Sequence, residues 1–331
     1  MKRAHNSESK SPNAEFLPAE STPREAENSK PKTQNSKRSF LIVLVLFLIG
    51  DFTIFHVLKS GIDRYYELNR PAQVLCVGYS HTVLGIDAER MEKELGVPVA
   101  KYATSGANAL DRLWMVRHYL EKQPSVKVVV YDVDPRMFDT EGLSSASYTL
   151  FLPYIDDPVM AQYLRQEATW QEYAASKLIR TARFRDQTIN IALRGLLGKI
   201  ENKKTTSIRV EDYQSRLGQE AARKIRVNPE SRQCFLDTLD FLTRRDIRVV
   251  LVYLPTIDLL NAVDPAGQAG MIRLFREVTE QNDKVYFFDL NRDYEHRHEL
   301  FYDLRHLNAE GNAVVTGRVV EVVKEVLSFG F

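Results

Sequence analysis

The hydrophobic and polar positions divide the chain into four stretches. Residues 1–38 contain almost no large apolar side chains, and 39–58 are almost continuously apolar. Residues 59–70 are mixed, and from 71 to 331 short apolar runs alternate with amphipathic stretches. The pattern predicts a leader, a hydrophobic segment, a linker and a folded domain.

A leader rich in Ser, Pro, Asn, Glu and Lys cannot bury enough surface to offset its conformational entropy, so we predict that 1–38 is disordered. Twenty helical residues reach about 30 Å, the hydrocarbon thickness of a bilayer, so 39–58 is predicted to be a transmembrane signal anchor. A cleaved signal peptide is disfavoured by the long leader and by the missing small-residue cleavage site. A buried core helix would need a partner to cover it on all sides. Asp51 interrupts the apolar run, and we place it near the lipid headgroups.

Basic residues set the expected orientation of this segment. Lys30, Lys32, Lys37 and Arg38 precede it without an intervening acid, whereas basic residues are sparser after it. The positive-inside rule then places the N-terminus in the cytoplasm and residues 71–331 outside, in the periplasm or at the cell surface.

The folded region alternates between strand and helix patterns. Five runs rich in β-branched and aromatic residues have the length and composition of buried parallel strands: 73–78, 97–102, 126–131, 247–253 and 284–289. Helical patterns occupy 88–95, with Asp87 as N-cap and Gly96 after its end, and also 110–122, 229–245, 267–281 and 309–327. This alternation predicts a doubly wound α/β sheet. Residues 151–228 contain no convincing strand and are interpreted as a helical insertion.

Composition excludes several classes of protein. The chain carries 45 Lys and Arg against 44 Asp and Glu, a net charge of +1, which argues against a nucleic-acid partner held by phosphate neutralisation. Its two cysteines, Cys76 and Cys234, are too few for a disulfide scaffold and lack the spacing of a zinc site. Cys76 falls in a predicted strand and is expected in the core.

Candidate chemistry lies at two distant places in the chain. Ser80 follows the first predicted strand, directly after Gly78 and Tyr79. Asp303 and His306 precede the last predicted helix. Because parallel strands present their carboxyl ends at one edge, the fold can bring Ser80 and His306 together, with Asp303 orienting the imidazole.

These motifs resemble those of the SGNH (GDSL-like) hydrolase superfamily. Gly78-Tyr-Ser80 matches the block that carries the family's nucleophile, and Asp303-Leu-Arg-His306-Leu-Asn-Ala-Glu-Gly311 matches its last block. The resemblance implies a flavodoxin-like five-stranded sheet, catalysis by Ser80, His306 and Asp303, and an oxyanion hole that includes Gly106 and Asn108. No Gly-x-Asn-Asp block follows the third strand, where the chain has Asp132-Val-Asp134-Pro instead. With its single N-terminal anchor, the chain resembles the envelope branch of the family, which includes the alginate O-acetylation and teichoic-acid D-alanylation proteins.

On this basis the chain is expected to be a membrane-anchored esterase or O-acyltransferase. Its substrate would be an O-acylated envelope glycan or a small acyl ester, it would need no metal or organic cofactor, and it could belong to an envelope protein complex. A catalytically silent glycan-binding or scaffold protein with the same fold is one alternative.

A second alternative is a magnesium-dependent phosphatase, because Asp132 and Asp134 end a hydrophobic strand as Asp-x-Asp. We interpret the pair instead as acids that end a strand and face solvent, and His81 as a loop residue. His296 and His298 are a weaker candidate for a metal site.

Overall fold

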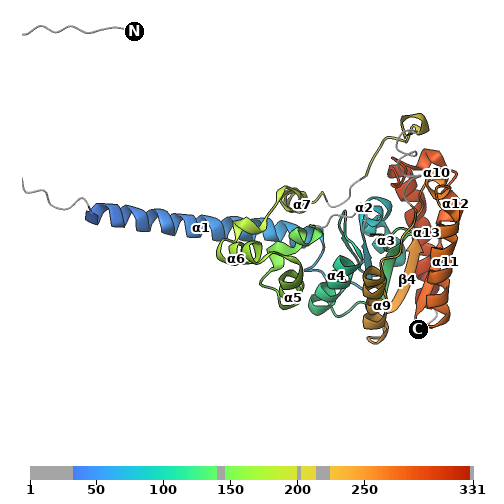
Figure 1. Cartoon of the computed structure of the whole chain (residues 1–331), viewed down its shortest axis with the longest axis horizontal. Helices are drawn as coiled ribbons and strands as arrows, with labels where there is room; N and C mark the ends of the chain where they lie inside the picture. Colours follow the sequence, from blue (N-terminus) through green and yellow to red (C-terminus); the bar gives the residue numbers. More distant parts are fainter. Residues whose placement is uncertain (1–32, 140–145, 200–202, 214–223, 329–331) are drawn as a thin grey trace, which may run out of the picture. The chain divides into compact units, whose positions relative to one another are not determined.

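A five-stranded parallel sheet forms the centre of residues 48–331 (Figure 1). The strand order in this computed structural model is β2-β1-β3-β4-β5. This order confirms the expected doubly wound, flavodoxin-like α/β fold. The strands are β1 (Val74–Gly78), β2 (Val99–Ala103), β3 (Val128–Val133), β4 (Arg248–Tyr253) and β5 (Val285–Asp289).

The structure describes residues 33–139, 146–199, 203–213 and 224–328. Its contacts divide the chain after Phe47, so the residues before and after that point are described separately. Most of the leader predicted to be disordered, residues 1–32, lies outside the described part.

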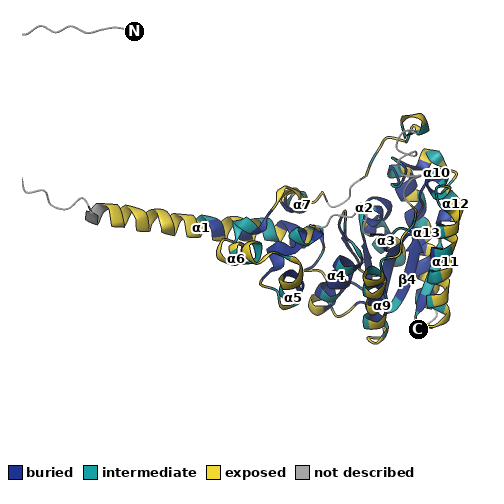
Figure 2. Ribbon diagram, viewed as in Figure 1, coloured by how far each residue is buried: buried dark blue, intermediate teal, exposed yellow. Residues whose placement is uncertain are grey.

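Helices cover both faces of the sheet. Alternate side chains of β1, β3 and β4 pack on α4 (Ala109–Lys122), α9 (Pro229–Thr243) and α11 (Pro265–Glu280), and the intervening ones pack on α3 (Ala88–Leu95) and α13 (Ala309–Ser328). The strands are therefore buried from both sides, as their apolar sequences require (Figure 2). Cys76 is fully buried in this core, as predicted.

The first helix is longer than the predicted anchor. Helix α1 extends from Thr33 to Tyr65, so it includes the end of the predicted leader and the start of the predicted linker at 59–70. Over Ser36–Tyr65 it is long and apolar enough to cross a membrane. Side chains from Phe40 to Ile49 are between 39 and 70 % exposed, so in the described structure this part of the helix is not packed in a core.

The first part of the predicted linker, up to Tyr65, is helical, and the linker packs on the domain. Ile62 and Tyr66 are almost fully buried in the core that covers one face of the sheet. Asp51 is also buried, and it accepts hydrogen bonds from the backbone N–H groups of Arg180 (3.0 Å) and Thr181 (2.7 Å). A carboxylate whose hydrogen bonds are met inside the protein does not need to reach the headgroups or an oligomer partner.

Between β3 and α9, where a helical insertion is expected, the described residues form helices and no strand. The elements are η1 (Ser147–Tyr154), α5 (Pro158–Glu167), α6 (Trp170–Leu178), η2 (Thr181–Arg183), α7 (Asp186–Leu196) and η3 (Val210–Tyr213).

Candidate active site

Ser80 lies at the carboxyl edge of the sheet because β1 ends at Gly78 and a short helix starts immediately. Helix α2 (Ser80–Gly85) begins with Ser80, so the Ser80 N–H has no acceptor within that helix. Gly78 is required at the turn. A Cβ there would overlap the Thr82 hydroxyl and approach the Cβ of Asp132 to 2.8 Å. Only glycine allows α2 to pack this closely over the end of β3.

Asp303 and His306 lie in a tight loop before α13. Tyr302 N–H donates to the His306 carbonyl (2.7 Å), and a bridge pairs Phe301 with Leu307. The Asp303 carboxylate accepts the backbone N–H groups of Arg305 (2.8 Å) and His306 (2.9 Å), which fixes the turn from within.

Contacts between α13 and α2 hold this loop next to Ser80. The Asn312 amide donates to the Leu84 carbonyl of α2 (2.7 Å), and Asp87 N–H donates to the Thr316 hydroxyl (3.0 Å). These contacts join the helix that starts with Ser80 to the helix that follows His306. The active-site geometry is thus set by packing between two helices far apart in the sequence.

The three side chains form one continuous hydrogen-bonded chain. Ser80 Oγ is 2.8 Å from His306 Nε2, and His306 Nδ1 is 2.9 Å from both carboxylate oxygens of Asp303. Burial alone would raise the pKa of Asp303, but hydrogen bonds from His306 and the two backbone N–H groups hold that pKa below its usual value. Asp303 is therefore ionised at neutral pH and can hold Nδ1 protonated, which leaves Nε2 as the acceptor for the Ser80 proton.

Below Ser80 lies a buried polar layer that the sequence did not predict. The Tyr79 hydroxyl donates to Asp134 (2.6 Å), and the Thr82 hydroxyl donates to Asp132 (2.9 Å). Because the Tyr79 proton is committed to Asp134, His81 Nδ1, 2.9 Å away, donates to the Tyr79 oxygen. Burial, with a smaller contribution from nearby positive groups including His306, holds the pKa of His81 well below its usual value.

The expectations for His81, Asp132 and Asp134 were wrong. His81 lies in α2 and is 3 % exposed, and the two carboxyl groups are buried rather than solvated. Burial raises the pKa of Asp132 to about 7. The Arg112 guanidinium, which donates to the Asp132 carbonyl (2.7 Å) and lies 4.6 Å from the centre of the Tyr79 ring, partly offsets this charge. The one signal in the sequence was the Gly-Tyr-Ser-His run, which contains Tyr79 and His81. Arg112 lies within a predicted helix and carries no motif that marks it as part of this layer.

The loop with Gly106 and Asn108 starts next to the nucleophile turn, because Thr104 N–H donates to the Gly78 carbonyl (3.3 Å). Gly106 has φ +85°, a left-handed conformation that favours glycine. The Asn108 side-chain oxygen accepts Asp111 N–H (2.9 Å) and caps α4. The cap uses the side-chain oxygen of Asn108 and not its amide N–H₂ group.

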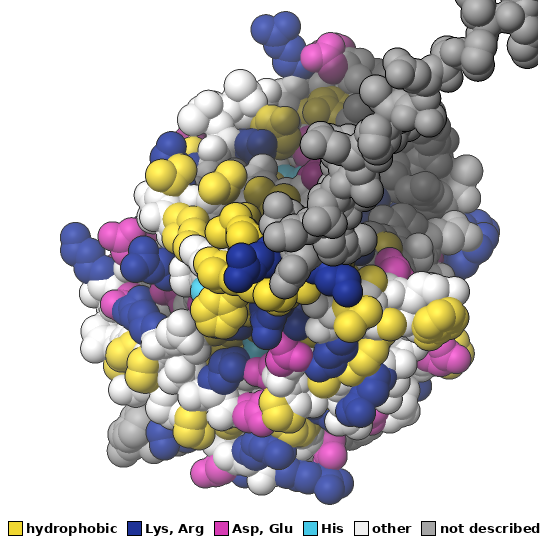
Figure 3. Space-filling model, turned by 90° about the vertical axis from the view of Figure 1, so that its left-hand side faces the viewer, with side chains coloured by type: hydrophobic (Ala, Val, Ile, Leu, Met, Phe, Trp, Pro, Cys, Tyr) yellow, Lys and Arg dark blue, Asp and Glu magenta, His cyan; other side chains and the backbone are white. Residues whose placement is uncertain are grey.

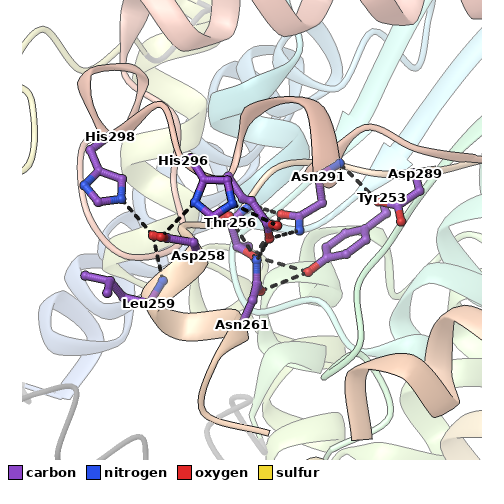
Figure 4. A network of polar contacts seen from close by, with 10 residues as sticks. Tyr253, Thr256, Asp258, Leu259, Asn261, Asp289, Asn291, His296 and His298 are labelled. Atoms are coloured by element: carbon purple, nitrogen blue, oxygen red, sulfur yellow. Dashed lines mark hydrogen bonds and ion pairs between the residues drawn. The ribbon is translucent and has the colours of Figure 1, made fainter. Parts of the chain in front are cut away.

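A second polar network supports the other side of the His306 loop (Figure 4). Asp258 contacts His296 Nδ1 (2.9 Å) and His298 Nε2 (2.7 Å). Its neighbour Ile257 donates its N–H to the Leu304 carbonyl (3.3 Å). Among the described residues no group of three or more acidic, His or Cys side chains is arranged to hold a metal ion. Asp258 thus links the two histidines to the segment whose Ile257 contacts the His306 loop.

Comparisons with known proteins give structural neighbours only. No family model matches the chain, and no curated protein matches it. Similar solved structures include a Bacteroides fragilis protein described as an acylhydrolase, with 13 % identity, TM-score 0.39, and coverage of 80 % of this chain and 94 % of that one. A GDSL-like lipase of Bacteroides thetaiotaomicron is 12 % identical, with TM-score 0.37 and coverage of 80 % and 98 %. A G-D-S-L family lipolytic protein of Desulfitobacterium hafniense is 9 % identical, with TM-score 0.36 and coverage of 76 % and 99 %.

Proposed function

We propose that this chain is an SGNH-type serine esterase or O-acyltransferase that acts on acyl esters of an envelope polysaccharide. The observation that carries the proposal is the unbroken chain from Ser80 through His306 to Asp303. A serine hydroxyl is a weak nucleophile unless a base removes its proton, and this geometry supplies the base and its orienting carboxylate.

In the proposed reaction, Ser80 Oγ attacks the acyl carbonyl while His306 Nε2 takes the Ser80 proton. The tetrahedral intermediate collapses to an acyl-Ser80 ester, and His306 gives the proton to the departing alcohol. Water or a sugar hydroxyl then attacks the ester, with His306 again as the base. Hydrolysis and acyl transfer differ only in this last acceptor.

The oxyanion would be received by N–H groups at the edge of the sheet. Our candidates are the backbone N–H groups of Ser80 and Gly106 and the side-chain amide of Asn108. Such donors typically contribute about 3–4 kcal/mol each to the stabilisation of the transition state. The free helix-start N–H of Ser80 and the hydrogen bond between Thr104 and Gly78 support this arrangement.

The proposed glycan substrate rests on the proposed placement of the domain outside the membrane. The small pocket that reaches Arg305, the residue before His306, is lined by polar and apolar side chains together, including Asp134, Arg136, Ile225 and Leu260. Its lining therefore does not select between a glycan ester and another acyl ester.

The enzyme proposal is tested with the full chain in detergent micelles and an aryl acetate as substrate. We expect hydrolysis that survives EDTA, is lost in Ser80→Ala, and is retained in the control Ser231→Ala on α9. Activity that needs magnesium, disappears in Asp132→Asn and persists in Ser80→Ala would favour the phosphatase alternative. A folded chain that binds glycan but hydrolyses no ester would favour the silent alternative.

The membrane topology is a separate part of the proposal. We place the N-terminus of α1 in the cytoplasm and residues 71–331 outside the membrane, because basic residues precede the apolar segment. With fusions to the C-terminus, a reporter that works only after export should be active, and a reporter that works only in the cytoplasm should be inactive. A fusion that is active only as a cytoplasmic reporter would reverse the orientation.

A further inference from the structure

Helix α1 has two different faces where it runs along the domain. Phe55 and Ile62 are buried against the core, whereas Phe52, Ile54 and Val57 are 52, 51 and 49 % exposed. On the exposed side these apolar side chains lie among the polar Thr53, His56 and Ser60. Apolar side chains on the outside of a helix that already packs on protein indicate a second, non-aqueous neighbour.

The turn between α6 and η2 is fixed beside this face. Besides accepting two backbone N–H groups, Asp51 accepts the Thr181 hydroxyl (2.6 Å). The two residues before Arg180 are apolar and exposed, with Leu178 at 79 % and Ile179 at 39 %. The Arg180 guanidinium lies 5.7 Å from the centre of the Phe52 ring. Asp51 therefore holds an apolar turn next to α1.

Helix α7 is packed on α1 through a pair of glycines. A Cβ on Gly61 would overlap the Ala192 carbonyl, and one on Gly195 would overlap the Gly61 carbonyl. The two backbones are thus in direct contact. The other side of α7 presents Ile189, Leu193 and Leu197, at 37, 49 and 68 % exposure. Their spacing of four residues places them in one stripe along the helix.

We call the exposed side chains of these two elements the collar: Leu178, Ile179, Ile189, Leu193 and Leu197. The stretch that contains them, residues 177–199, has six basic residues and one acidic residue. Figure 3 views the molecule from the side of α1, α6 and α7, and shows apolar side chains gathered there with Lys and Arg among them. Apolar and basic side chains together are the composition of surfaces that lie in a membrane interface.

The length of the uncharged part of α1 points to the same neighbour. Between Arg38 and Asp51 there are twelve residues, Ser39–Gly50. At about 1.5 Å per residue they span about 18 Å, some 12 Å less than the hydrocarbon thickness of a bilayer. Because Asp51 is held within the domain, protein surface around Asp51 must make up the missing depth.

We infer that the collar is immersed in the membrane leaflet on the domain's side, and that its basic neighbours contact lipid phosphates. This inference rests on α1 crossing the membrane, as proposed above. An interfacial surface is typically buried about 5–10 Å deep, which is close to the depth that α1 lacks. The domain is then seated on the bilayer rather than tethered to it by a flexible linker.

The test measures where nitroxide labels lie, using the full chain in phosphatidylcholine–phosphatidylglycerol nanodiscs. Labels are placed singly at Leu193→Cys and Leu197→Cys in a Cys234→Ser background, since Cys76 is buried. Collisions with oxygen, which concentrates in lipid, are compared with collisions with a water-soluble nickel chelate. Leu44→Cys reports the span, and Val227→Cys, 45 % exposed and outside the collar, is the matched control.

We expect the ratio of oxygen to nickel collisions at both collar positions to exceed that at Val227 several-fold and to approach that at Leu44. Frequent nickel collisions at the collar, with frequent oxygen collisions at Leu44, would refute the immersion of the collar and leave the membrane span standing. Nickel access at Leu44 as well would overturn the membrane span and the collar with it. Collar labels shielded from both reagents would mean that protein, not lipid, covers this surface.

Discussion

Replacing Asp303 by asparagine separates the charge of this residue from its role in the loop. In Asp303→Asn the side-chain oxygen can still accept the N–H groups of Arg305 and His306, so the turn should keep its shape. The charge beside His306 Nδ1 is lost, and the amide N–H₂ can face Nδ1 and favour the wrong tautomer.

The geometry sets the size of the effect. A hydrogen bond to a charged group contributes about 1.5–3 kcal/mol, and the Asp303–His306 bond at 2.9 Å is such a bond whenever His306 carries the transferred proton. That range corresponds to about 10- to 160-fold in rate, and the unfavourable tautomer extends the expected loss in kcat toward about 10⁴-fold.

The assay is the pre-steady-state acylation rate with an aryl acetate, together with the apparent melting temperature. At neutral pH Asp303→Asn should melt slightly below the wild type because the charge is lost, whereas Asp303→Ala, which also frees the two backbone N–H groups, should melt several degrees lower. Because the folded-state pKa of Asp303 is lowered, its charge adds stability above pH 4. The difference between wild type and Asp303→Asn should shrink as the pH falls further.

Asp240→Asn, an exposed acid on α9, is the control and should change neither quantity. An Asp303→Asn enzyme within threefold of the wild-type acylation rate would refute the proposed role of the carboxylate.

Two further changes test the layer beneath Ser80. Gly78→Ala should force α2 away from β3, lower the free energy of unfolding by about 1–3 kcal/mol and remove most of the activity. The control Gly270→Ala, whose Cβ meets nothing within 4 Å, should change neither. Equal melting temperatures for the two variants would show that the close approach is unimportant. Asp132→Asn should stabilise the chain relative to the wild type increasingly from about pH 4 to pH 7, by at most about 4 kcal/mol. Over this range the raised pKa keeps the Asp132 carboxyl protonated in the folded wild type, whereas the unfolded wild type ionises it and is stabilised. A difference independent of pH in thermal melts would contradict this.

The sequence predicts the features that depend on local patterns. The five strands, the cap at Asp87 and the glycine at Gly96 follow from periodicity and capping chemistry, and the structure confirms them. Ser80, Asp303 and His306 could be selected because strand ends in a parallel sheet converge at one edge. The motif alone did not show that α13 and α2 hold them in hydrogen-bonding contact.

The features that the sequence did not predict depend on contacts between distant residues. Asp51 looks like a charge within a membrane span until Arg180 and Thr181 are seen to donate to it. Asp132 and Asp134 look like solvated strand ends because nothing nearby in the sequence shows that Thr82 and Tyr79 cover them. Burial of a polar group is set by the tertiary fold.

A covalent adduct on Ser80 would most directly test the proposed chemistry. The full chain is treated with a fluorophosphonate, digested and analysed by mass spectrometry. We expect the adduct on the peptide that contains Ser80 and no adduct on that peptide in Ser80→Ala. In His306→Ala labelling should be slowed by about 10³-fold or more, because His306 is the only base within reach of Ser80 Oγ among the described contacts. A folded wild-type chain that remains unlabelled, or that carries the adduct on a different serine, would contradict the assignment of Ser80 as the nucleophile.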